Sequence, residues 1–241
     1  MAQVQMDNPH CGNRLLAALD DEDFAYLEPH LTLVDLHRGQ VVYEAGQRLD
    51  YTYFPHTAVI SLVTVMLDGK SAEMATFGCE SIVGLVSAFI SRDSFGRYIV
   101  QIGGTASRVD LDRMHDAFRT RPKVQQLLLR FTEALLAQTL QSVACNATHS
   151  VEARCCRWIL NTRDRWASDD IPLTHEFLSE MLGVQRSSVS AVTRALHEAG
   201  LINQSRGVIT IIDRSGLEEM ACECYEIIRR KFSQLLPPTN P

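Results

Sequence analysis

The chain has 241 residues, of which 46% are hydrophobic and 22% are charged, which suits one large globular domain or two small ones. No apolar run approaches the roughly 20 residues that span a bilayer, and the polar start has no secretory signal, so we expect a cytoplasmic protein with no membrane partner. The formal net charge of −6 argues against a protein that coats nucleic acid non-specifically, but it allows a local basic face.

The sequence from 11 to 111 is predicted to form a β-rich domain. Two short helices come first, because an apolar-periodic stretch containing Leu15 and Phe24 is interrupted by acidic residues at 20–23. Short β-type runs then follow at nearly regular spacing: 31–36, 41–43, 51–54, 59–66, 72–77, 98–102 and 106–109. Asp68-Gly69 predicts a hairpin, because both turn residues can adopt a positive φ. This series of strands indicates a barrel or sandwich.

Residues 112–148 are predicted to form a dimerisation helix and hinge. Pro122 suits the first turn of a helix, where a missing N–H costs nothing. The helix is apolar on more than one face, which implies either burial inside one domain or a second packing partner. Spacing of four, three and four residues is typical of a coiled-coil contact. On that basis the expected dimer interface is Val124, Leu128, Phe131 and Leu135.

Residues 149–236 carry a helix-turn-helix pattern followed by a β-hairpin. Thr174 is expected to cap the first helix, Gly183 to take the left-handed position of the turn, and the second helix to begin near Gln185. The hairpin, or wing, ends at Ile212 and has Arg206 at its tip. Helical spacing turns Val189, Val192 and Leu196 inward, and it turns Arg186, Ser187, Ser190, Ala191, Thr193 and Arg194 outward.

An outward face of arginine and small hydroxyl side chains suits a DNA major groove. Arginine can grip guanine bidentately, and serine can contact bases or phosphates. The candidate base contacts are Arg186, Ser187 and Ser190, and the candidate phosphate contacts are Thr174, Arg194 and Arg206. The full set of predicted DNA-binding residues is Thr174, Gln185, Arg186, Ser187, Ser188, Ser190, Arg194 and Arg206.

The order of these parts resembles the cyclic-AMP receptor/fumarate-nitrate regulator (Crp/Fnr) family of bacterial transcription factors. The resemblance is carried mainly by the runs at 78–84, 173–174, 183–189 and 199–202. It implies an α+β fold with a cyclic-nucleotide-binding-like β-roll, a long dimerisation helix and a C-terminal winged helix-turn-helix. It also implies a homodimer that regulates transcription by binding a palindromic operator in double-stranded DNA, and that contacts RNA polymerase if it is an activator.

The resemblance fails where cyclic AMP would bind. Family members that hold it use a Gly-Glu pair for the ribose and an Arg-Ser-Ala run for the phosphate, but this chain has Gly84-Leu85 and Arg97-Tyr98-Ile99. Leucine cannot accept a ribose hydroxyl, and the larger side chains would crowd the phosphate, so we expect no cyclic AMP binding. Arg97 is left to bind another anion or to pair with an acid such as Glu80. The candidate pocket residues are Glu80, Gly84, Leu85, Arg97, Tyr98 and Thr139.

The second helix of the motif also departs from the well-known members. They place a glutamate after the first arginine and another arginine four residues further on, where this chain has Ser187 and Ala191. The expected operator therefore differs from theirs. A regulatory subunit without a DNA role is the alternative from another class, and the complete wing and second helix count against it.

Other cofactors and switches find little support in the sequence. The iron–sulfur branch uses an N-terminal cysteine cluster, where this chain has only Cys11, and no histidine is marked as a haem ligand. The seven cysteines contain no C-x-x-C pair, so no metal site is predicted and no cofactor is assigned. The alternative function is a regulator of the same family that responds to a cyclic nucleotide or to redox state. Its switch would be Arg97 or cysteine thiols, either Cys155-Cys156 or Cys222 and Cys224. The chain lacks a phosphate loop and a nucleophile elbow, so we expect no enzyme.

Overall fold

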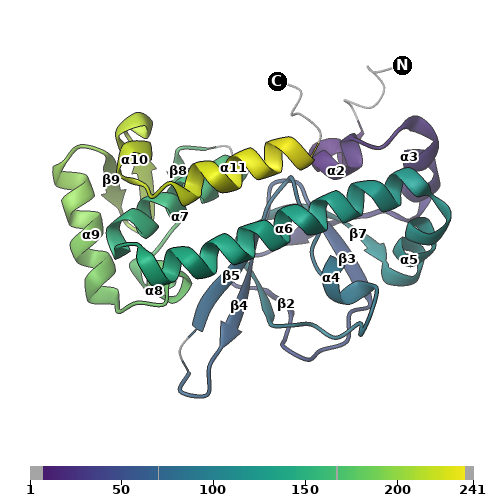
Figure 1. Ribbon diagram of the computed structural model, residues 1–241, viewed down its shortest axis with the longest axis horizontal. Helices are drawn as coiled ribbons and strands as arrows, with labels where there is room; N and C mark the ends of the chain where they lie inside the picture. The colour runs from purple at the N-terminus through teal and green to yellow at the C-terminus, as the bar shows by residue number, and fades with distance from the viewer. Residues whose placement is uncertain (1–7, 70, 167, 237–241) are drawn as a thin grey trace.

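The computed structural model describes residues 8–69, 71–166 and 168–236 (Figure 1). The described part begins with a 3-10 turn at Pro9–Gly12, which is followed by the two predicted short helices, α2 (Arg14–Ala17) and α3 (Asp21–Leu27). A second 3-10 turn, Glu28–His30, leads into the strands. Asn13 starts α2 by accepting backbone hydrogen bonds from Leu15 and Leu16, and Asp20 caps α3 in the same way through Asp23.

Seven antiparallel strands form two sheets, and every predicted β-run is a strand. They are β1 (Thr32–Leu36), β2 (Val41–Tyr43), β3 (Tyr51–Pro55), β4 (Val59–Val65), β5 (Ser71–Phe77), β6 (Arg97–Ile102) and β7 (Gly104–Asp110). One sheet has the order β1-β7-β3 and the other β2-β6-β4-β5. The predicted hairpin joins β4 to β5, where Val65 pairs with Ser71 and Gly69 has a φ of 83°. The expected β-roll is therefore confirmed.

Two helices form the segment that was predicted to be helical. The first, α5 (Leu111–Thr120), follows the last strand of the β-roll, which itself contains the one-turn helix α4 (Leu85–Ala88). The long helix α6 (Pro122–Thr148) starts after Arg121, which has an extended backbone at φ −118° and ψ 96°. A residue before proline is driven out of the helical region, which explains the break. Pro122 occupies the first turn, as predicted.

The C-terminal part contains the predicted winged helix-turn-helix. Its helices are α7 (Val151–Trp166), α8 (His175–Leu182), α9 (Arg186–Glu198), α10 (Arg214–Met220) and α11 (Cys224–Leu235). Its strands are β8 (Asp170–Ile171), β9 (Ile202–Ser205) and β10 (Val208–Ile211), in the sheet order β8-β10-β9. Helix α11 runs beside α6 in the opposite direction, and α9 lies at one end of the long axis of the molecule (Figure 1).

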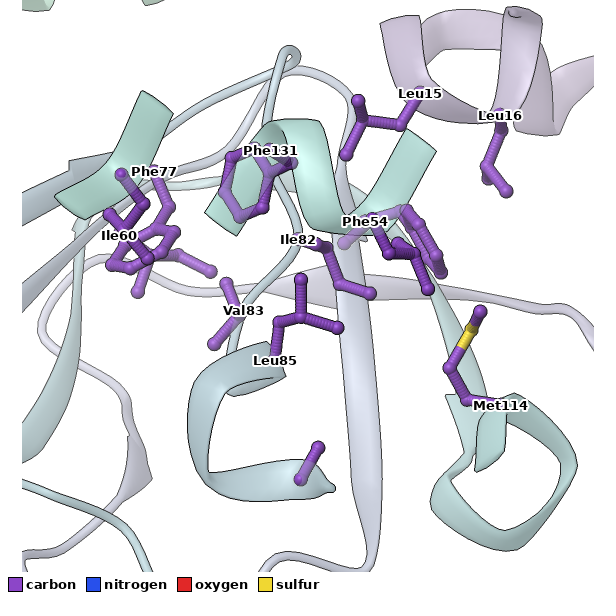
Figure 2. Packing of buried hydrophobic residues seen from close by; sticks show 14 of the residues in the cluster. Leu15, Leu16, Phe54, Ile60, Phe77, Ile82, Val83, Leu85, Met114 and Phe131 are labelled. Atoms are coloured by element: carbon purple, nitrogen blue, oxygen red, sulfur yellow. The ribbon is translucent and has the colours of Figure 1, made fainter. Parts of the chain in front are cut away.

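The predicted dimer seam on α6 is wrong for all four positions. Val124, Leu128, Phe131 and Leu135 are at most 9% exposed and belong to the core that α6 forms with its own β-roll. Figure 2 shows Phe131 among Phe77, Ile60 and Ile82. Helical spacing identified an apolar stripe correctly, but the partner of this stripe is the same chain. The stripe of large apolar side chains left exposed on α6 is Leu129, Leu136, Leu140 and Val143.

The C-terminal domain packs directly against the four-stranded sheet. Val59, Val63 and Ile102 of the β-roll share an apolar cluster with Trp158 and Ile159 of α7. Glu73 on β5 accepts a hydrogen bond from Trp158 Nε1 at 2.8 Å. In the part of the chain that the structure describes, no helix has both the length and the apolar character that crossing a membrane requires.

Candidate nucleic-acid interface

The helix-turn-helix is built from local backbone preferences. Thr174 Oγ1 accepts a hydrogen bond from the Phe177 amide at 3.2 Å and caps α8. Gly183 ends α8 in the left-handed conformation, with a φ of 64°, and the Val184 amide donates to the Ser179 carbonyl at 3.0 Å. Gln185 then precedes the first residue of α9 as its N-cap. The predicted positions of Thr174, Gly183 and Gln185 in the motif are confirmed.

The outer face of α9 is open at its N-terminal end. Gln185, Arg186, Ser187, Ala191 and Arg194 are exposed. Arg186 is 68% exposed, and its Nη1 lies 3.4 Å from Glu176 Oε2, whose side chain is 65% exposed. Such a surface ion pair is worth little, so the guanidinium can leave it for another anion at small cost.

Thr193 does not face outward, contrary to the helical-spacing prediction. Its side chain is fully buried, and its Oγ1 donates to the Val189 carbonyl at 2.9 Å and lies 3.2 Å from His175 Nε2. Hydroxyl bonding to the carbonyl four residues back is a common way to bury threonine in a helix. Thr193 therefore belongs to the packing of the motif.

His175, which the sequence did not single out, links the three parts of the motif. Its Nδ1 lies 3.1 Å from Ser190 Oγ on α9, and its Nε2 lies 3.0 Å from Gln204 Oε1 on the wing strand β9. A neutral ring with the proton on Nε2 satisfies both contacts, because Ser190 then donates to Nδ1. Ser190 is thus half-buried and engaged, and Ser188 is also half-buried. One histidine among eight carries no spacing signal that would have revealed this role.

The wing is a tight hairpin with its arginine exposed. Ser205 pairs with Val208, and both intervening residues have positive φ, 41° at Arg206 and 82° at Gly207, as a two-residue hairpin turn requires. A groove of about 580 Å³ lies between the wing, the start of α8 and the start of α9. Arg186 and Arg206 both line it, so two cations border one groove beside Thr174.

The predicted nucleotide pocket is filled by core side chains. Tyr98 is 4% exposed, and its ring centroid lies 5.6 Å from that of Phe77 and 6.4 Å from that of Tyr43. Burial raises the pKa of Tyr98 above its usual value, as expected for a phenol inside a core. Leu85 is 2% exposed and points into the same core (Figure 2). Gly84 precedes it with a φ of 84° and lies against Leu49.

The charged and polar members of that predicted pocket are also dispersed. Of the two alternatives for Arg97, the structure shows pairing with an acid, but the acid is Glu44 rather than the suggested Glu80: Arg97 Nε lies 2.9 Å from Glu44 Oε2 at the surface. Glu80 instead lies in the junction between the β-roll and α7, where it pairs with Arg165. Thr139 Oγ1 donates to the Leu135 carbonyl at 2.9 Å within α6. The six candidate residues are therefore not gathered around one space.

The cysteines fall into two kinds of environment. Cys155 and Cys156 are fully buried, and burial raises the pKa of Cys156 to about 12 and that of Cys155 further, which makes them inert thiols. Cys222 and Cys224 instead lie beside Cys145 and His149. Spacing in the sequence does not reveal Cys145 and His149 as neighbours, because both lie more than 70 positions from Cys222 and Cys224 along the chain.

Comparison with known proteins supports the fold and the motif. Residues 153–220 match the model of the Crp-like helix-turn-helix domain. FixK2 from Bradyrhizobium japonicum has a similar structure, with a TM-score of 0.69 and 17% identity over 80% of this chain and 98% of that chain. A putative transcriptional regulator of the crp/fnr family from Eubacterium rectale gives a TM-score of 0.68 and 14% identity, covering 87% of this chain and 98% of that one.

A third similar structure is the c-di-GMP responsive global regulator CLP of Xanthomonas campestris. It gives a TM-score of 0.66 and 15% identity over 80% of this chain and 99% of that chain. No curated protein sequence matches this chain. At these identities the similar structures establish the fold, and the match at 153–220 establishes the motif.

Proposed function

We propose that this chain, which carries a Crp-like helix-turn-helix domain within the fold of Crp/Fnr regulators, is a sequence-specific DNA-binding transcription regulator. The observation that carries the proposal is the groove between α8, α9 and the wing, because Arg186 and Arg206 border it at the end of the molecule. The proposal includes no catalytic role.

Base contacts are assigned to the open N-terminal end of α9. Arg186 and Ser187 are exposed there, and Ala191 is small enough to let the helix approach the bases closely. Ser190 contributes through its hydroxyl, although His175 holds it. A major-groove arginine that binds guanine O6 and N7 gives the strongest discrimination in such a site.

Phosphate contacts are assigned to Thr174, Arg194 and Arg206, with Gln185 and Ser188 beside them. Thr174 Oγ1 accepts from the Phe177 amide, which leaves its O–H free to donate to a phosphate oxygen. Arg206 on the wing tip and Arg194 on α9 are both exposed. These contacts orient the protein on the duplex without reading its sequence.

The proposed homodimer forms through the exposed stripe of α6. Leu129, Leu136, Leu140 and Val143 follow one another at steps of seven, four and three residues, which is the spacing of a coiled-coil seam. Each is more than half exposed, so the stripe needs a partner of equal length and chemistry, and a second copy supplies one. Two recognition helices then meet half-sites of a palindrome about one turn of DNA apart.

The proposed sensor domain does not bind cyclic AMP. Tyr98 and Leu85 occupy the region where the nucleotide would lie, and opening it would expose two core side chains. An activator of this type would also contact RNA polymerase.

A footprint on genomic DNA tests these points together, with and without cyclic AMP and cyclic GMP. We expect protection of a two-fold symmetric site that is unchanged by either nucleotide and weakened by salt, because phosphate contacts release counterions. Absence of any salt-dependent specific site would overturn the DNA-binding proposal. A large gain of protection with cyclic AMP would overturn the proposal for the sensor domain alone.

A further inference from the structure

Four side chains of the kinds that bind metals meet where the long helix joins the C-terminal domain. Cys145 lies in the last turn of α6, His149 is the C-cap of that helix, and Cys222 and Cys224 flank the start of α11. Their sulfur and nitrogen atoms all lie within 4.8 Å of one another. The three thiols are buried, and the side chain of His149 is 23% exposed.

The spacing of these atoms suits a tetrahedral ion. Cys145 Sγ lies 3.4 Å from Cys222 Sγ, and Cys224 Sγ lies 3.6 Å from His149 Nδ1. Zn–S bonds of about 2.3 Å and Zn–N bonds of about 2.0 Å at tetrahedral angles put ligand atoms roughly 3.5–3.8 Å apart. The two ligand atoms that lie farthest apart, at no more than 4.8 Å, therefore have to approach each other by only about 1 Å, which rotation of the side chains can provide.

A second layer of contacts already orients two of the four groups. His149 Nε2 lies 3.2 Å from a carboxylate oxygen of Glu223, so Nε2 carries the proton and Nδ1 turns its lone pair toward the sulfurs. The Gln141 amide donates to Cys224 Sγ at 3.1 Å. A histidine held by a carboxylate on its far nitrogen is the usual support of a metal ligand.

The surrounding charge also suits an anionic centre. Three thiolates and one neutral imidazole around Zn²⁺ carry a net charge of −1. Arg154 and Arg157 on α7 are each 8% exposed, and no described carboxylate lies within ion-pair distance of either. Both guanidinium groups interact electrostatically with Cys145, so they lie close enough to offset the negative charge of such a centre.

We propose that Cys145, His149, Cys222 and Cys224 form a closed Cys3His site for Zn²⁺. The ion would tie the end of α6 to the start of α11, and so fix the angle at which the C-terminal domain leaves the long helix. Sites with four protein ligands and no open position are structural. The assignment stands apart from the DNA-binding proposal, since it depends only on these four side chains.

The metal content of the full-length chain, purified under reductant from zinc-supplemented cells, tests the site. We expect one zinc per chain in the wild type and in Cys11→Ser, which removes a partly exposed thiol elsewhere, and less than a tenth of that in Cys145→Ser. Equal zinc in Cys145→Ser and the wild type would overturn the proposal. So would a Cys145–Cys222 disulfide in the reduced preparation, because that would make the pair a redox couple.

Cobalt(II) titration of the metal-free wild type keeps the test independent of whether the cysteine variants fold. We expect one equivalent of Co²⁺ to produce the visible bands of a tetrahedral ion together with thiolate-to-metal charge transfer. Glu223→Gln should weaken Co²⁺ binding about 10- to 100-fold, the usual effect of removing such a support. His149→Gln should shift the visible bands. A spectrum of octahedral cobalt without charge transfer would overturn the site.

Discussion

Arg165 and Glu80 form an ion pair across the junction of the two domains, with Nε and Oε1 2.7 Å apart and both side chains 8% exposed. The same guanidinium donates to Gln138 on α6 at 3.1 Å and to the Asn161 carbonyl at 3.0 Å. Its carbon lies 5.8 Å from the ring centroid of Phe232 on α11. One arginine thus joins the β-roll, α6, α7 and α11.

Replacing Glu80 by Gln should lower the free energy of unfolding by about 3 kcal/mol, because Arg165 would remain buried without a counter-charge. Urea unfolding measures the loss. Glu22→Gln is the matched control, since Glu22 pairs with Arg121 but is 82% exposed, and it should cost less than about 1 kcal/mol. Equal losses in the two variants would show that burial of the pair is unimportant.

Replacing Arg186 by Ala should weaken binding to the footprinted site by about 1–3 kcal/mol, since a bidentate base contact is lost. Binding to unrelated DNA should change little. Arg119→Ala on α5, at the other end of the molecule, removes the same charge away from the groove and should leave both affinities unchanged (Figure 1). Fluorescence anisotropy at two salt concentrations makes the comparison. A uniform loss on all DNA would assign Arg186 to phosphate instead.

Replacing Leu136 and Leu140 together by Asp should convert the dimer to a monomer, because the charges would be buried in the proposed seam. Sedimentation equilibrium measures the change. The fold of each chain should persist, since both positions are more than half exposed. Leu33→Asp, at a position on β1 that is 48% exposed, should leave the dimer intact. A double variant that stays dimeric would exclude this stripe as the interface.

Replacing Leu128 by Ala probes the other face of α6. Leu128 is 2% exposed inside the core, so we expect a loss of about 2–5 kcal/mol in the free energy of unfolding. The subunit dissociation constant should change little under conditions where the chain is folded. If the Leu128→Ala variant were instead a monomer with an unchanged free energy of unfolding, Leu128 would belong to the dimer interface.

Stability should also depend on the protonation of His56. Burial, with a smaller effect from His10, lowers the pKa of His56 to about 4, and both rings share the hydroxyl of Ser107 at 2.7 and 2.6 Å. Between pH 6.5 and 4 the unfolded chain binds a proton at this residue that the folded chain does not. Lowering the pH from 6.5 to 4 should therefore decrease the free energy of unfolding, and His56 contributes at most about 3 kcal/mol to this decrease.

His56→Gln tests this assignment, because an amide can keep a hydrogen bond to Ser107 without titrating. Chemical unfolding of both proteins at several pH values isolates the difference from the carboxylates that titrate in the same window. Parallel curves for variant and wild type would assign the pH dependence to other groups.

Local patterns in the sequence determined most of the fold. The seven strands follow from β-rich runs between turn residues, and Gly69, Pro122 and Gly183 mark a hairpin, a helix start and a helix end through backbone preferences that need no partner. The helix-turn-helix could be predicted for the same reason, because inward apolar positions and a left-handed turn lie within about twenty residues of one another.

Only the tertiary structure decided which groups meet. Two apolar stripes on α6 are chemically alike, so periodicity could not tell which one faces the β-roll, and the choice of Phe131 over Leu136 depends on the shape of that core. The partners of Arg97 and Glu80, and the meeting of Cys145 with Cys222, depend on how elements far apart in the chain pack together. Contacts across such distances leave no spacing in the sequence, because the intervening fold rather than the chain brings them together.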